Sequence, residues 1–271
     1  MNHFASSVIS VSFRGCIFTL SQCDGYSVRD PACITALPAP TIRLATILCL
    51  CLLALCAFAP SDAGLRDFTR LAALAEERHG ADAAQRIRDW ERLLMRASTQ
   101  KEPEQIRMVN EFFNRNVIYG SDADLWGQPD YWATPLETLG VAGGDCEDYA
   151  IAKYVSLRKL GIPDSRLRLF YVYARLGALF SNAEEAHMVL GYFPSEDVEP
   201  LILDNLITDI RPASLRKDLT PIFSFNSDGL WIDGSADSAG DSTARLSNWR
   251  GVLERMRADG INLNRPITAG E

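Results

Sequence analysis

Apolar residues recur every three or four positions through three stretches of this chain, at residues 65–77, 81–96 and 102–116. This spacing gathers the apolar side chains on one face of a helix and leaves the charged residues on the other. A fourth helical pattern begins at Cys146 and ends before Gly161. We therefore predict four helices in this part of the chain, the last with clear start and stop residues.

After Pro163 the helical spacing gives way to short apolar or alternating runs that are bounded by turn residues, as is typical of strands. These runs lie at residues 167–173, 186–193, 201–204, 222–225 and 230–232. The last two flank Asn-Ser-Asp-Gly, which is a hairpin signal, and a helical pattern at residues 247–256 follows them. Helices followed by strands predict an α+β fold, with helices packed on an antiparallel sheet.

The N-terminal part of the chain has a different pattern. Residues 1–40 show no periodicity, whereas Arg43 precedes an apolar run at residues 44–58, which Ser-Asp-Ala follows closely. This run is shorter than the roughly 20 residues of a bilayer span, and its flanks are those of a secretory signal peptide. We predict an unstructured leader plus signal peptide over residues 1–63 and one exported domain over residues 64–271. A permanent membrane anchor is the alternative.

Charge and cysteine placement narrow the candidate functions. A net charge of −8 without a basic cluster argues against a nucleic-acid partner. Six of the seven cysteines precede residue 60, so Cys146 is the only thiol of the predicted domain. One cysteine cannot form an internal disulfide. It is therefore either a buried core residue or a nucleophile.

The position of Cys146 favours the nucleophile. Gly143 and Gly144 predict a tight turn, and Asp145 is a good N-cap residue, so the thiol lies at the start of a helix. Backbone N–H groups and the positive end of the helix dipole stabilise a thiolate there.

A cysteine nucleophile needs a base, and the predicted domain contains only His79 and His187. His79 lies in a polar segment, whereas His187 lies on an apolar strand, where an imidazole needs a polar partner. Asp204 ends another apolar run and can supply that partner, while Asp197 and Asp209 lie in polar surroundings and are weaker candidates. A core histidine satisfied by hydrogen bonds is the alternative reading of His187.

We therefore predict a triad of Cys146, His187 and Asp204. Trp132, in an aromatic loop before the cysteine, is a candidate for lining the cleft or for donating its indole N–H to an oxyanion. Ordinary packing of this loop is the alternative.

Three acidic residues surround the thiol in sequence: Asp145, Glu147 and Asp148. Negative charge near the sulfur opposes thiolate formation. Because successive helical residues rotate by about 100°, we expect these carboxylates to point away from Cys146 and to converge. Converging carboxylates predict a Ca²⁺ site, and favourable interaction with the helix dipole is the alternative.

The quoted motifs resemble those of a known family. The chain contains Gly-Gly-Asp-Cys-Glu-Asp-Tyr-Ala with Lys153, then Ala-His-Met-Val-Leu and Leu-Ile-Leu-Asp-Asn, and it has Tyr-Trp-Ala-Thr-Pro-Leu-Glu-Thr-Leu upstream. These motifs occur in the order found in the bacterial transglutaminase-like cysteine peptidases of the LapG type. The resemblance implies a papain- or transglutaminase-like fold, the triad above, and calcium ligands at Asp145 and Glu147, with Asp148 as a third.

The same resemblance implies a function in the periplasm. Such a protease cleaves the N-terminal region of a large surface adhesin, which releases the cell from a biofilm. An inner-membrane receptor for cyclic di-GMP (LapD-like) restrains it. Two alternatives stay open: an acyl transferase that uses the same triad with an amine as acceptor, and a non-catalytic binding module.

Overall fold

The computed structural model describes residues 63–175, 184–195, 197–232 and 238–267. The leader and signal peptide predicted for residues 1–63 lie outside these residues, apart from Ala63. Within the described ranges, no helix combines the length and the apolar character needed to span a membrane.

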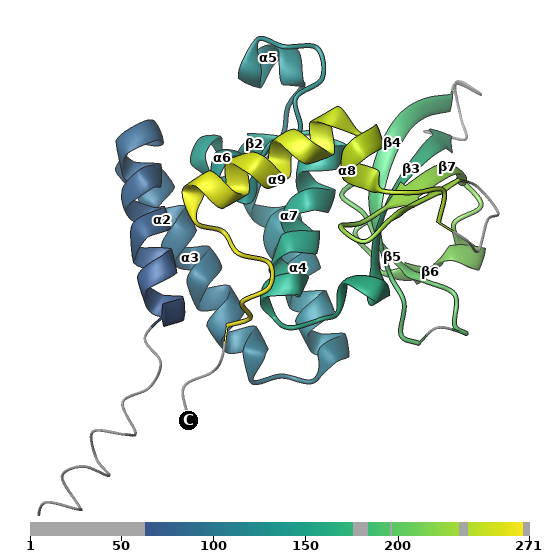
Figure 1. Cartoon of the computed structure of the whole chain (residues 1–271), viewed down its shortest axis with the longest axis horizontal. Coiled ribbons are helices and arrows are strands. Elements are labelled where there is room, and N and C mark those ends of the chain that lie inside the picture. Colours follow the sequence, from purple (N-terminus) through teal and green to yellow (C-terminus); the bar gives the residue numbers. More distant parts are fainter. Residues whose placement is uncertain (1–62, 176–183, 196, 233–237, 268–271) are drawn as a thin grey trace, which may run out of the picture. The chain divides into compact units, whose positions relative to one another are not determined.

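The predicted helices are present, and one of them lies at the centre of the domain. Helices α2 (Ala63–His79), α3 (Ala81–Ser98) and α4 (Glu102–Asn116) match the three amphipathic patterns. Helix α7 (Cys146–Lys159) packs against α4 on one side and against the sheet on the other (Figure 1). Because it is covered on most sides, nearly all of its residues are buried. This burial holds the start of α7, and hence Cys146, in a fixed position.

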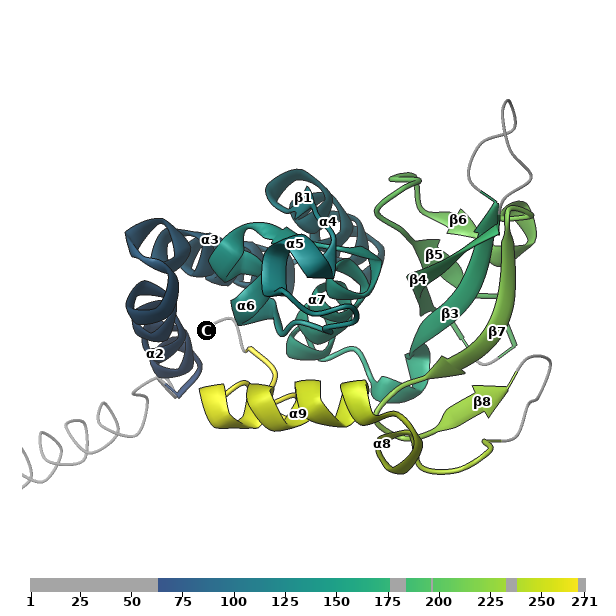
Figure 2. The same ribbon diagram turned by 90° about the horizontal axis from the view of Figure 1, so that it is seen from above.

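The main sheet has six strands in the order β6-β5-β4-β3-β7-β8, and every neighbouring pair is antiparallel. The strands are β3 (Leu167–Arg175), β4 (Glu184–Tyr192), β5 (Leu201–Leu203), β6 (Arg211–Pro212), β7 (Leu219–Phe225) and β8 (Leu230–Ile232). Figure 2 shows α4 and α7 on one side of this sheet. The predicted α+β fold, with the cysteine-bearing helix packed on an antiparallel sheet, is confirmed.

The described residues also form four further helices and two 3-10 turns. They are α5 (Asp122–Trp126), α6 (Pro135–Val141), η1 (Asp164–Arg166), η2 (Ala213–Leu215), α8 (Ser242–Arg245) and α9 (Ser247–Asp259). A capping box begins α6, because Thr134 accepts from the backbone of Glu137 and the Glu137 side chain accepts in return.

A small parallel pair of strands lies just before α7. Strand β1 (Ile118–Tyr119) pairs with β2 (Gly143–Gly144), and no strand was expected at either place. Each strand has two residues, which is too short for any periodic signal. The pairing fixes the two glycines that lead into Cys146.

Candidate active site

Cys146 is the first residue of α7, as the Gly-Gly-Asp sequence predicted. The backbone N–H of Met188 on β4 lies near the sulfur and acts to lower the pKa of the thiol. The S–H group of Cys146 donates to Glu147 Oε2, at 3.0 Å. The thiol is partly buried and lies against the strand that carries His187, the residue directly before Met188.

His187 and Asp204 form the buried pair that the sequence predicted. The His187 Nε2 and Asp204 Oδ1 atoms are 2.9 Å apart. When Nε2–H donates a hydrogen bond to the carboxylate, Nδ1 is the unprotonated ring nitrogen and can accept a proton. Asp204 follows the last residue of β5, which neighbours β4 in the sheet, so the strand order brings the two residues together.

Asp204 is held in its charged form by several donors. Arg216 Nη2 donates to its Oδ2 at 2.7 Å, and the Leu206 N–H donates to its Oδ1 at 3.0 Å. Burial raises the pKa of this carboxyl, but the hydrogen bonds from His187, Leu206 and Arg216 outweigh it and lower the pKa to about 2. Arg216 was not predicted, because it lies in a polar segment without periodicity. Its burial among polar sequence neighbours appears only in the folded chain.

The weaker candidates lie elsewhere. Asp197 is exposed, and Asp209 is exposed and pairs with Arg211. His79 packs its ring against Gly140 of α6.

The acidic residues beside the thiol form one cluster with two further aspartates that were not predicted. The cluster consists of Asp122, Asp130, Asp145, Glu147 and Asp148. One carboxylate oxygen from each of Asp122, Asp145 and Asp148 lies within 4.8 Å of the other two, and the same holds for the group of Asp122, Asp130 and Glu147. Asp122 and Asp130 come from the segment that includes α5. Their contribution depends on how this segment folds over the start of α7, which no local pattern encodes.

One expectation about this cluster is wrong. Glu147 does not point away from the sulfur, because its Oε2 accepts the Cys146 S–H. Helical rotation sets the direction of the Cα–Cβ bond only, and the longer glutamate side chain bends back.

The cluster fits a hard cation. Tyr131 N–H donates to Asp122 Oδ2 at 2.6 Å, and Ala133 N–H donates to Asp148 Oδ1 at 2.7 Å, which orients both carboxylates. Asp122 Oδ1, Asp145 Oδ1 and Asp148 Oδ2 are buried and have no hydrogen-bond partner among the described residues. Converging carboxylate oxygens of this kind are the ligands that Ca²⁺ prefers. A Cβ atom at Gly144 would lie 2.7 Å from Asp148 Oδ2, so the site also requires this glycine.

Without a cation, the cluster disfavours both its own ionisation and that of the thiol. Burial and the adjacent Glu147 raise the pKa of Asp145 to about 9. Burial, and after it the negative charge of Glu147, raise the pKa of Cys146 far above its usual range, while the Met188 N–H acts against this. A bound divalent cation would remove the repulsion that these negative charges impose on the thiolate.

Trp132 contacts this cluster. Its indole N–H donates to Asp130 Oδ1 at 3.0 Å, its ring stacks on Phe225, and the residue is 8% exposed. Since this N–H is engaged by Asp130, the structure adds no support to the oxyanion role, and that role and the lining of the cleft stay predictions.

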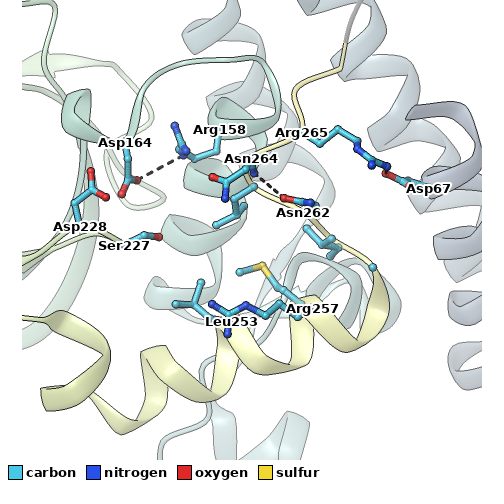
Figure 3. Close-up of a pocket in the computed structure, with 14 residues that line it drawn as sticks. Asp67, Arg158, Asp164, Ser227, Asp228, Leu253, Arg257, Asn262, Asn264 and Arg265 are labelled. Carbon is cyan, nitrogen blue, oxygen red and sulfur yellow. Dashed lines mark hydrogen bonds and ion pairs between the residues drawn. The ribbon is translucent and has the colours of Figure 1, made fainter. Parts of the chain in front are cut away.

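A separate polar pocket of about 560 Å³ contains none of the predicted site residues. Figure 3 shows Arg158 and Asp164 on one side of it and Arg257 on α9. It lies at the far end of α7 from the thiol.

Comparisons with known proteins show what this chain is similar to. The family model described as bacterial transglutaminase-like cysteine proteinase matches residues 81–217. The EGTA-treated structure of LapG from Legionella pneumophila is similar, with a TM-score of 0.61 and 36% identity over 70% of this chain and 97% of LapG. Its calcium-bound structure has a TM-score of 0.60 and 35% identity over 70% of this chain and 98% of LapG. No curated protein matches.

Proposed function

Because this chain belongs to the bacterial transglutaminase-like cysteine proteinases, we propose that it is a calcium-dependent endopeptidase that acts through Cys146, His187 and Asp204. The observation that carries the proposal is the buried His187–Asp204 hydrogen bond on the strand against which the sulfur lies. The cysteine protease class follows from the family, and the roles of these three residues are our proposal.

The proposed reaction is acyl transfer to water. Nδ1 of His187 takes the thiol proton, and the sulfur of Cys146 attacks the carbonyl carbon of the scissile peptide. The Cys146 N–H at the start of α7 is placed to donate to the oxyanion that forms. His187 then gives its proton to the leaving amine, and water releases the acyl group with the same imidazole as base. Asp204 fixes the ring and its tautomer throughout.

Ca²⁺ would be held by Asp122, Asp145 and Asp148, with Asp130 and Glu147 beside them. When bound, it would supply a positive charge that offsets the carboxylates around the thiol. The calcium-bound and EGTA-treated states of the similar LapG support calcium binding as a property of this fold.

We expect Ca²⁺ to raise the Tm of the protein, and to raise it more at pH 8 than at pH 5. The pKa of Asp145 is raised from 3.8 to about 9 in the metal-free fold, so between these values the folded state binds more protons than the unfolded state. Stability in chelator therefore falls as pH rises through this window. Calcium replaces the protons and removes this loss of stability. Thermal unfolding with and without chelator at the two pH values measures the difference.

The matched variants for this measurement are Asp145→Asn and Asp124→Asn. Asp124 is an exposed residue of α5 outside the cluster. Asp145→Asn should lose the calcium-dependent rise in Tm, and Asp124→Asn should keep it. A rise of equal size in both variants would place the cation elsewhere.

We further propose a periplasmic location, a large surface adhesin as substrate, and restraint by an inner-membrane receptor for cyclic di-GMP. The family and the similarity to LapG support these proposals. The signal-peptide pattern before residue 64 agrees with export.

A cleavage assay tests the proposed function. Purified protein with the predicted leader and signal peptide removed is added to the N-terminal fragment of a surface adhesin, in calcium or in chelator. We expect two products with one new N-terminus in calcium, and intact fragment in chelator. An amine-labelled or crosslinked product would instead identify the acyl transferase. A Cys146→Ala protein that keeps the full effect on adhesin release would identify a binding module.

A further inference from the structure

Two polar side chains of α9 contact the loop that carries Asp130 of the acidic cluster. Helix α9 (yellow in Figure 1) lies outside residues 81–217, which the family model matches. The loop comprises residues 127–134, which form neither helix nor strand. Because no ladder of backbone hydrogen bonds fixes the shape of such a loop, contacts with side chains have to hold it.

The first contact holds a carboxylate of the cluster directly. Asn248 Nδ2 donates to Asp130 Oδ2 at 2.7 Å, although 118 positions separate the two residues in the chain. The other oxygen, Oδ1, accepts from the indole N–H of Trp132 at 3.0 Å. An oxygen of Asp130 lies within 4.8 Å of oxygens of Asp122 and Glu147. The two donors therefore orient a carboxylate of the cluster, and one of them belongs to α9.

The second contact acts on the peptide bond between Trp132 and Ala133. Arg255 Nη2 donates to the Trp132 carbonyl oxygen, and the Ala133 N–H of the same peptide donates to Asp148 Oδ1 at 2.7 Å. In a planar trans peptide the C=O and N–H groups point in opposite directions. Holding the carbonyl therefore aims the N–H at the carboxylate. A hydrogen bond to the carbonyl also polarises the peptide and strengthens the bond that its N–H donates.

The guanidinium of Arg255 is itself fixed by its neighbours. Its Nε atom lies 3.2 Å from Glu137 Oε1, and its central carbon lies 4.6 Å from the centre of the Tyr131 ring. The Tyr131 hydroxyl donates to Glu137 Oε1 at 2.9 Å, and the Tyr131 N–H donates to Asp122 Oδ2 at 2.6 Å. Arg255 thus also holds the residue whose N–H orients a second carboxylate of the cluster.

Attachment of α9 to the domain does not depend on these polar contacts. Its buried apolar residues join the core, and they are Trp249, Val252, Leu253 and Met256. Burial of such side chains is the main stabilising contribution to helix packing. Asn248 and Arg255 are only partly buried. Their hydrogen bonds therefore act mainly on the loop, and through it on the carboxylates.

We propose that Asn248 and Arg255 are positioning residues of the calcium site, through which α9 holds residues 130–133 so that the carboxylates of Asp130 and Asp148 face the cation. This inference rests on the proposed calcium site. Groups that orient metal ligands in this way contribute about 10- to 100-fold to metal affinity. Charge alone predicts the opposite sign, because removing the positive charge of Arg255 would strengthen the attraction of a cation.

The test is calorimetric titration of the metal-free protein with Ca²⁺. We expect Arg255→Met to raise the Kd for Ca²⁺ by about 10- to 100-fold, and Asn248→Ala by about 10-fold. Arg255→Lys keeps the charge but lacks the planar fork, so it should also raise Kd. The matched control is Arg257→Met, which removes a positive charge from an exposed position of the same helix and should keep the wild-type Kd.

The titration separates failure of this inference from failure of the calcium site. Unchanged Kd in Arg255→Met and Asn248→Ala, with Asp145→Asn unable to bind Ca²⁺, overturns the positioning role alone. A lower Tm in chelator without a change in Kd would show a merely structural role, and a lower Kd in Arg255→Met would show an effect of charge alone. Either result overturns the inference. Wild-type protein that binds no Ca²⁺ overturns the proposed calcium site as well.

Discussion

Replacing Cys146 by alanine is expected to lower kcat/KM for adhesin cleavage by at least about 10³-fold, because no other group can form the acyl intermediate. Cys146 is the only cysteine of the described residues, so no second thiol can take its place. Cleavage of the fragment in calcium, followed by electrophoresis and N-terminal analysis of the products, gives the rate.

The fold should survive this substitution. The one hydrogen bond of the thiol among the described residues is to Glu147, and α7 is held by the buried residues that follow it. We therefore expect Tm to change by no more than a few degrees, and Cys146→Ser to behave in the same way. Cleavage that persists at the wild-type rate in both variants would remove the sulfur from the mechanism.

The main elements were predictable because they carry local signals. The Gly-Gly-Asp sequence before Cys146 marks the start of α7, and period-two runs mark β3 and β4. Strands that follow one another in sequence usually pair, which suggested that Asp204 would lie beside His187. The pair at 2.9 Å bears this placement out as geometry, while its catalytic role stays a prediction.

The remaining parts of the site depend on contacts between distant segments. Asp122 and Asp130 reach the cluster because the backbone at Tyr131 and the indole of Trp132 hold their carboxylates. Arg216 reaches Asp204 from a segment without any periodic pattern. Such contacts are set by tertiary packing, which a single sequence does not display.

Substitution of Asp204, which both His187 and Arg216 contact, tests the proposed site directly. Asp204→Asn is expected to lower kcat by about 10²- to 10⁴-fold, because an amide does not fix the imidazole in the tautomer that leaves Nδ1 free. It also removes the more buried of the two carboxylates that pair with Arg216, and breaking a buried pair costs up to about 3–5 kcal/mol. Thermal or urea unfolding measures the loss of stability, and the cleavage assay measures kcat.

The pH dependence of that loss identifies its source. The carboxyl of Asp204 has a folded pKa of about 2, below its ordinary 3.8, so its contribution to stability is complete above about pH 4 and disappears as pH falls toward 2. The stability difference between wild type and Asp204→Asn should shrink over the same interval. Asp218→Asn is the matched control, because Asp218 also pairs with Arg216 at 2.7 Å but its side chain is 32% exposed. If the Asp204–Arg216 pair contributes a buried charge interaction, Asp204→Asn should lose far more stability at neutral pH than this control. Equal losses of stability would contradict that contribution.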